Sequence, residues 1–328
     1  MSIRLHIGLA ALAMLLFVAS LLIGPAALDP LTSLKGLIAG GGEAAIIIMR
    51  EIRLPRALLG VMIGASLGLS GAALQGFLRN PLAEPGIIGV SATASLGAVV
   101  VFYTGIAGAS IFVLPAGALV GATVAVLLLL AIAAGNTTTL TLILAGVALT
   151  SLAGALTSLV LNLSPNPFAS YEIIFWLLGS LKDRSMVHVW ICLPLMAAGW
   201  ILILLSGRAL DALSFGEETA ASLGVDMARA RLMIVGGVAL CVGAGTAVTG
   251  AIGFVGLVVP HLVRPLTDRM PSRLLVPSAL GGAALLLAAD IAARVVVPER
   301  ELNVGVLTAL IGAPFFLWLV IRSRREAI

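Results

Sequence analysis

The sequence predicts an all-α integral membrane protein, and three observations lead to this fold class. Of the 328 residues, 60% are hydrophobic and 10% are charged, whereas a soluble domain carries about 25% charged residues. The mean hydropathy is +1.17, which is more apolar surface than a water-soluble fold could bury. Uncharged stretches recur along the chain, and about 20 such residues form a helix that crosses a bilayer core.

The first uncharged stretch, residues 7–28, follows Arg4 and His6 and resembles a secretory signal peptide. It is longer than the apolar region of a signal peptide, which usually has about 7–15 residues. We therefore expect it to be retained as the first membrane span.

Charged residues and glycine clusters divide the remaining sequence, so that ten spans are expected in one transmembrane domain that covers residues 1–328. The apolar stretch 232–263 is too long for one span and has five glycines in its middle (Gly243, Gly245, Gly250, Gly253 and Gly256), so we divide it near Gly250. Segment 208–231 connects the sixth and seventh spans. The expected spans are approximately 7–27, 57–78, 85–104, 111–133, 140–161, 189–207, 232–249, 251–263, 274–297 and 302–321.

Ten spans place both termini on the same side, and the loops on that side hold 11 of the 19 basic residues. The positive-inside rule makes that side cytoplasmic. Segment R-E-I-R-L-P-R, residues 50–56, opposes this trend, and so does Arg294 at the outer end of the ninth span. Two interpretations remain open at this point. The arginines could snorkel at the interface, with Arg50 paired to Glu51, or they could receive an external partner.

Two further patterns concern packing inside the membrane. Gly60, Gly64 and Gly68 recur every four residues in the second span, and small residues on one face let membrane helices approach closely. Asp290 and Arg294 are four residues apart and can pair along one helix face. The stretch G-A-S-L-G around Ser66 matches a nucleophile elbow, but that motif requires a turn between a strand and a helix. Helix packing is the favoured interpretation, and no catalytic residue is predicted.

Composition and motifs exclude several other classes of site. The three histidines are far apart, and both cysteines lie within apolar runs, so no metal site is predicted. Neither lysine follows a glycine, so the chain has no P-loop for ATP. The predicted spans have almost no ionisable residues at mid-membrane, where ion-coupled transporters usually carry them. A transport function would therefore draw its energy from a partner, and the net charge of +4 gives no reason to expect nucleic acid.

Two cytoplasmic stretches carry further signals. R-N-P-L-A-E-P-G, residues 79–86, is an abrupt turn because Pro81 and Pro85 stop helices. It is either a plain connection or a gate at the inner end of a pore. In L-S-F-G-E-E-T-A-A-S-L-G-V, residues 213–225, Ser214 and Glu217 match a capping box and Gly224 suits a helix terminator. A short helix with an acidic start and a small apolar face (Ala220, Ala221 and Leu223) is expected, either as loop structure or as a contact for a soluble partner.

Several longer motifs resemble those of FecCD-type permeases, the membrane subunits of type II ABC importers for iron chelates, haem and cobalamin. The resemblance covers nearly the whole chain in the same order. The motifs are R-L-P-R-A-L-L-G (53–60), S-G-A-A-L-Q-G-F-L-R-N-P-L-A-E-P-G-I-I-G-V-S (70–91), G-A-I-G-F-V-G-L-V-V-P-H-L-V-R (250–264), L-A-A-D-I-A-A-R (287–294) and G-A-P-F-F (312–316).

The resemblance implies an assembly in the inner, cytoplasmic membrane of a bacterium. Two copies of the permease would form a homodimer within the lipid, around a central pathway. A cytoplasmic ABC ATPase dimer would bind ATP and magnesium, so that this chain is not itself an enzyme and has no cofactor of its own. A periplasmic substrate-binding protein would dock outside. The family also has an inverted repeat, which relates spans 2–5 to spans 7–10.

The resemblance also implies roles for individual residues. Arg53, Arg56 and Arg294 match the arginines that receive acidic residues of the binding protein. The residues that match the ATPase-coupling segment are Glu217, Glu218, Ala221 and Gly224. The residues that match the inner gate are Asn80, Leu82, Thr138 and Thr139. Three consecutive threonines occur at 137–139, so which of them lines the gate stays open.

The expected function is import by alternating access, with an iron chelate, either a siderophore or haem, as the cargo. Cobalamin is the alternative within the family. An ATP-independent channel or secondary transporter is the alternative from another class, and a membrane enzyme that depends on Ser66 is a more distant one. The loop at residues 163–185 is expected to face outside, where it could contact the binding protein.

Overall fold

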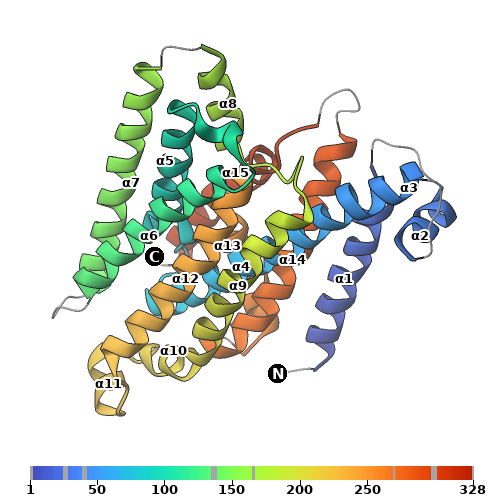
Figure 1. Cartoon of the computed structure of the whole chain (residues 1–328). Helices are drawn as coiled ribbons and strands as arrows, with labels where there is room; N and C mark the ends of the chain where they lie inside the picture. The colour runs from blue at the N-terminus through green and yellow to red at the C-terminus, as the bar shows by residue number, and fades with distance from the viewer. Residues whose placement is uncertain are drawn as a thin grey trace.

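The computed structural model describes residues 3–24, 29–38, 43–133, 139–164, 167–268, 270–296 and 301–326. Within these ranges the chain forms a bundle of packed helices (Figure 1). In chain order they are α1 (Ile3–Leu22), α2 (Pro30–Ile38), α3 (Glu43–Ile47), the π-helical η1 (Ile48–Arg53), α4 (Leu54–Phe77), η2 (Pro85–Ile88), α5 (Val90–Tyr103), η3 (Ile106–Ala109), α6 (Val113–Ala133), α7 (Thr139–Asn162), α8 (Pro167–Leu177), α9 (Met186–Leu205), α10 (Gly207–Leu213), α11 (Glu217–Ser222), α12 (Met227–Thr249), α13 (Val255–Val263), η4 (Arg264–Leu266), α14 (Pro271–Val295) and α15 (Val304–Glu326).

Seven helices among the described residues are long and apolar enough to cross a membrane. They are α1, the continuous run Ala44–Phe77 that contains α4, and α6, α7, α9, α12 and α14. Three shorter apolar helices, α5, α13 and α15, lie at the positions of the third, eighth and tenth expected spans. α12 ends at Thr249, where Gly250 has a φ of +74°, a conformation that glycine adopts readily.

The structure contains helices that hydropathy did not predict. α2, α3 and η1 fill the connection between the first two spans, and α8 occupies much of the 163–185 loop. α8 belongs to the bundle because Ile173 and Trp176 turn their side chains inward and are 0% and 8% exposed. An 11-residue helix is too short to give a membrane-span signal, so the sequence showed only a loop.

α4 and α14 pack directly against each other, and glycines make this contact possible. A Cβ atom on Gly64 would collide with the carbonyl of Gly282, and one on Gly68 would collide with the carbonyl of Ser278. A Cβ on Gly60 would lie 3.0 Å from the side chain of Leu287. The predicted packing role of this glycine face is therefore confirmed.

Ser66 belongs to the same packed region of α4. It is fully buried, and its hydroxyl accepts a hydrogen bond from the indole N–H of Trp200 at 2.8 Å. A serine in the middle of a helix, with its hydroxyl engaged by a tryptophan, has the packing role that the sequence favoured over a nucleophilic one.

The two ends of the bundle differ in what they present. At the upper right of Figure 1, α1 and α14 end and α4 begins, close to α2 and α3. We call this the arginine end, because Arg53, Arg56 and Arg294 lie there. At the bottom of the same view lie α10, α11 and the N-terminus. We call this the α11 end.

Candidate functional site

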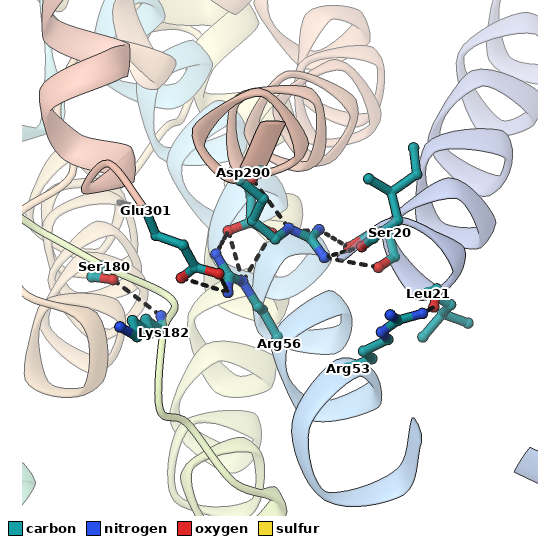
Figure 2. A network of polar contacts seen from close by, with 10 residues as sticks. Ser20, Leu21, Arg53, Arg56, Ser180, Lys182, Asp290 and Glu301 are labelled. Atoms are coloured by element: carbon teal, nitrogen blue, oxygen red, sulfur yellow. Dashed lines mark hydrogen bonds and ion pairs between the residues drawn. The ribbon is translucent and has the colours of Figure 1, made fainter. Parts of the chain in front are cut away.

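Arg53, Arg56 and Arg294 lie close together at the arginine end, although 238 positions separate the last two in the sequence. Figure 2 shows the polar network to which they belong. The first two are one turn apart where η1 passes into α4, and Arg294 lies in the last turn of α14. They are 4%, 7% and 7% exposed. The structure thus brings together the three arginines that the sequence singled out, and it buries most of their surface.

Two of the arginines cap the end of α1. Arg53 and Arg294 donate hydrogen bonds from their Nη1 atoms to four successive carbonyl oxygens, those of residues 20–23, at 2.7–3.0 Å. Arg294 also donates to the hydroxyl of Ser20 at 2.6 Å. The last carbonyls of a helix lack partners within the helix and carry partial negative charge. Both guanidinium groups therefore join α1 to the rest of the bundle.

Asp290 is the buried carboxylate of this cluster. It is 0% exposed and lies between two guanidinium groups, with Oδ1 2.9 Å from Nη2 of Arg56 and Oδ2 2.8 Å from Nη2 of Arg294. The second pair confirms the predicted contact between residues four apart on one helix. Removing either partner of such a buried pair leaves an uncompensated charge, so Asp290 stabilises the burial of both arginines.

Glu301 provides a second carboxylate, from the segment just before α15. Its Oε1 and Oε2 atoms accept hydrogen bonds from Nη1 of Arg56 at 3.3 and 3.2 Å. The guanidinium of Arg56 therefore binds two carboxylates, Asp290 at Nε and Nη2 and Glu301 at Nη1. Nothing in the sequence links residues 56 and 301, because only tertiary packing brings the segment before α15 beside α4.

A cavity of about 210 Å³ opens beside this cluster. Its basic lining residues are Arg53, Arg56, Lys182 and Arg294, and its acidic ones are Asp183 and Glu301. The lining therefore has an excess of positive charge. Arginines that line a cavity are suited to binding a carboxylate, because the guanidinium stays charged and offers a planar set of donors.

Arg50 follows the same principle on the outside of the cluster. Its Nε and Nη2 atoms donate to the carbonyl oxygen of Leu37 at 3.1 and 2.8 Å. This carbonyl lies in the last turn of α2. One alternative from the sequence was a pair with Glu51; the structure shows Arg50 bound to a helix end.

At the opposite end, the short helix α11 begins at Glu217 and so has the expected acidic start, but the predicted capping box is wrong. The N-cap residue is Gly216, with a φ of +109° and no side-chain cap. The hydroxyl of Ser214 instead donates to the carbonyl of Asp211 at 2.6 Å, because Ser214 still belongs to the turn that ends α10. Gly224 has a φ of +84°, which agrees with its predicted role as terminator.

The surface of α11 differs from the predicted apolar face. Ala220 is buried, whereas Ala221, Gly224 and Glu218 are exposed. Glu217 forms an ion pair with Arg231 of α12 at 3.1 Å.

The most exposed apolar side chains of this region flank α11. They are Phe215 at 68% and Leu223 at 65%. Sequence reasoning missed Phe215, although an aromatic residue between charged segments is a signal that could have been used.

α10 attaches this region to α14. The carboxylate of Asp211 accepts the backbone N–H of Ser272 at 2.8 Å and its hydroxyl at 2.6 Å. This caps the start of α14, the helix whose other end carries Asp290 and Arg294. One continuous helix therefore connects the α11 end to the arginine end.

The proposed gate residues are only partly described. Asn80 is exposed, and its side-chain oxygen accepts the backbone N–H of Leu82 at 2.9 Å, which forms a tight turn. Leu82 is half-buried. Thr138 lies outside the described residues, and so does the side chain of Thr139, the first residue of α7.

Glu84, in the same loop, was missed as a structural residue. Its Oε1 atom accepts the backbone N–H of Phe254 at 2.5 Å, where α13 begins. Nearby, the amide of Gln75 donates to the carbonyl of Leu257 in α13 at 3.3 Å and accepts from Arg264 at 2.7 Å. Burial raises the pKa of the Glu84 carboxyl, and the hydrogen bond from Phe254 opposes this in part. The turn at Asn80 is thus fastened to α13.

α7 carries exposed hydroxyl-bearing and glycine residues between exposed apolar ones such as Leu144, Val147 and Leu152, a pattern that sequence reasoning also missed. The hydroxyls of Thr150 and Ser151 donate to carbonyls one turn earlier, each at 2.9 Å. The exposed polar and glycine residues of the helix are Thr141, Thr150, Ser151, Gly154, Ser158 and Asn162.

Comparisons with known proteins agree with this architecture. The model of the FecCD transport family matches residues 12–322. A solved structure described as an inward-facing conformation of an ABC transporter, assigned to the metal-chelate type, is 33% identical. It covers 98% of this chain and 100% of its own, with a TM-score of 0.86.

Several curated relatives are permeases. The cobalamin import system permease protein BtuC of Halobacterium salinarum is 44% identical over 86% of this chain and 75% of its own. The Fe(3+) dicitrate transport permease FecD of Escherichia coli is 40% identical over 86% and 88%. The hemin transport permease HmuU of Yersinia pestis is 38% identical over 85% and 84%. The chain therefore belongs to the FecCD transport family, as the membrane-spanning permease subunit of a type II ABC importer, without an ATPase site of its own.

Proposed function

We propose that this permease carries an iron chelate, either a siderophore or haem, across the inner membrane of a bacterium. Two copies would form a homodimer, with an ATPase dimer on the cytoplasmic side and a substrate-binding protein on the outer side. Both termini would be cytoplasmic, which follows from the distribution of basic residues. The relatives named for ferric dicitrate and hemin support this class of cargo, as does the neighbour assigned to the metal-chelate type.

In this proposal all ten apolar helices cross the membrane. The three shorter ones, α5, α13 and α15, would do so together with the seven longer ones. α4–α7 and α12–α15 would form the two inverted repeats. α1 and α9 would lie outside the repeats.

The observation that carries the proposal is the basic cavity at the arginine end. Arg53, Arg56 and Arg294 would receive acidic side chains of the binding protein there. The cavity supports this because the three guanidinium groups line it together and because its lining has more basic than acidic residues. Their burial also makes them rigid donors, so that little side-chain entropy is lost when a carboxylate binds.

At the α11 end, α11 and its flanking residues would contact the ATPase. Phe215 and Leu223 are exposed apolar side chains beside a short helix, and apolar anchors of this kind typically dock in a groove of a partner. Glu217, Glu218, Ala221 and Gly224 would complete the contact. Movement of α11 would reach α14 through the bonds between Asp211 and Ser272.

The exposed hydroxyl-bearing residues of α7 would line the pathway between the two copies. An uncharged, weakly polar surface suits a large hydrophilic chelate that has to pass without being held. The turn at Asn80 and Leu82, together with Thr138 and Thr139 where α7 begins, would close the inner end. Alternating access would follow from opening the two ends in turn.

Cobalamin is the second candidate cargo, because a relative named as a cobalamin import permease is 44% identical to this chain. The two candidates are distinguished by uptake into liposomes that contain the permease, the ATPase and the binding protein encoded beside it. Labelled ferric siderophore, haem and cobalamin would be compared, each with ATP and with a non-hydrolysable analogue. ATP-dependent uptake of siderophore or haem supports the proposal. Uptake of cobalamin alone would show that cobalamin is the cargo instead of an iron chelate. Equal uptake without ATP would indicate a channel or secondary transporter.

A further inference from the structure

Two carboxylates bind Arg56, and of these Glu301 lines the cavity whereas Asp290 does not. The side chain of Asp290 is 1% exposed, whereas that of Glu301 is 16% exposed. Asp290 lies beneath the cluster, within α14, and Glu301 lines the cavity itself. A partner that enters the cavity would therefore meet Glu301.

The two carboxylates also bind Arg56 with unequal geometry. Asp290 occupies Nε and Nη2 of Arg56, with distances of 2.9–3.2 Å. Glu301 occupies only Nη1, at 3.2 and 3.3 Å. Strong hydrogen bonds between a guanidinium and a carboxylate are shorter, at about 2.7–2.9 Å. The Glu301 contact is thus the longer and more solvent-accessible of the two, as expected of the weaker one.

An incoming carboxylate would compete with Glu301 for the same donor. The cavity has a volume of only about 210 Å³, so two carboxylates beside Nη1 of Arg56 would lie close together. Like charges at short distance repel strongly where little water separates them. The presence of Glu301 therefore weakens the attraction of the cavity for a further acidic side chain.

We propose that Glu301 is the residue that limits the affinity of the arginine cavity for the binding protein. Its carboxylate occupies the outward donor of Arg56 and yields it when an acidic side chain of the binding protein enters. When the binding protein leaves, Glu301 binds Arg56 again. The inference rests on the proposed docking of the binding protein at this cavity.

The segment that carries Glu301 has other attachments, so its charge can be removed without releasing it. The backbone N–H of Leu302 donates to the carbonyl of Ala293 at 3.1 Å. The side chain of Asn303 donates to the carbonyl of Phe175 at 3.3 Å. The backbone N–H of Gly305 donates to the carbonyl of Gly179 at 3.0 Å. These bonds hold the start of α15 independently of residue 301.

The test is the dissociation constant of the binding protein encoded beside this chain, measured on the permease with its ATPase in lipid nanodiscs. Glu301→Gln and Glu301→Ala should each bind about three- to tenfold more tightly than the natural chain, mainly through slower dissociation. Glu301→Asp keeps the charge and should stay within about twofold of the natural chain. Glu51→Gln removes the same charge from an exposed residue of η1 and should leave the constant unchanged.

Arg56→Gln separates this inference from the docking proposal. Loss of binding in Arg56→Gln, with unchanged or weaker binding in Glu301→Gln and Glu301→Ala, would overturn the role of Glu301 and leave docking intact. Unchanged binding in Arg56→Gln would overturn both. Association with the ATPase at the α11 end reports folding of each variant. If neither neutral variant at 301 assembles with the ATPase, the pairing is structurally obligatory, and the inference is also overturned.

Discussion

The carboxylate of Glu84 accepts the backbone N–H of Phe254 at 2.5 Å and thereby joins the loop after α4 to the start of α13. Phe254 has a φ of +67°, which is uncommon for a residue other than glycine. Its side chain lies against α15, where a Cβ on Gly312 would collide with it. One carboxylate thus supports a strained residue at the contact between α13 and α15.

Glu84→Ala should lower the free energy of unfolding by about 2 kcal/mol, because it leaves the backbone N–H of Phe254 without its partner at a part-buried site. The measurement is thermal unfolding of the purified permease in detergent. Glu51→Ala removes an exposed carboxylate and serves as the control. Equal unfolding temperatures for the two variants would show that the Phe254 contact contributes nothing to stability.

The same carboxylate predicts a dependence on pH. Because burial raises the pKa of Glu84 above its ordinary value of 4.5, folding favours its protonated form. The stability that this provides is present below the ordinary pKa and is lost as the pH rises through the raised pKa. Glu84→Gln cannot titrate, so its unfolding temperature should rise relative to the natural chain over this interval. A difference that stays constant from pH 4 upwards, or falls, would contradict the shift.

Asp290→Asn should destabilise the arginine end, because it leaves two buried guanidinium groups without their shared carboxylate. Breaking a buried ion pair by removing one partner costs about 3–5 kcal/mol. Asp183→Asn, an exposed residue of the same cavity, is the matched control. Thermal unfolding of both variants would decide the matter, and equal stability would mean that Asp290 does not hold the cluster together.

Gly64→Ala should weaken the packing of α4 on α14, since the added methyl group meets the backbone of Gly282. Overpacking of this kind costs about 1–3 kcal/mol. Gly154→Ala, in α7, has no heavy atom within 4 Å of the added Cβ and should be tolerated. The yield of monodisperse protein after detergent extraction measures both effects. A normal yield for Gly64→Ala would show that the contact can relax.

Leu223→Ala should weaken association with the ATPase about tenfold, as expected when an exposed apolar anchor of an interface is truncated. Thr219→Ala alters an exposed polar residue of α11 and should have little effect. Co-purification at graded ATPase concentrations gives the affinity. If both variants bind like the natural chain, the contact with the ATPase lies elsewhere.

The sequence predicted those features that depend on local composition. Apolar stretches located the long helices, and the glycines of α4 correctly indicated close packing. A local pattern misled where it fits both a helix start and a helix end. Ser214 and Glu217 match a capping box at the start of α11, but Ser214 lies in the turn that ends α10.

Contacts between distant segments were beyond the sequence. The charge distribution and the resemblance to a family both singled out Arg53, Arg56 and Arg294, but neither indicated a partner for Arg56. That side chain meets Asp290 and Glu301 across more than 230 residues, and only tertiary packing brings them together. Glu84 was missed for the same reason, because its partner is a backbone N–H of α13.

The central claim is that the arginine end receives the binding protein while the α11 end drives the ATPase. The most direct measurement is ATP hydrolysis inside liposomes when loaded binding protein is added outside. The account predicts that the added protein stimulates hydrolysis by the natural chain and that Arg56→Gln or Leu223→Ala reduces this stimulation severalfold. Stimulation that is equal in both variants and in the natural chain would contradict it.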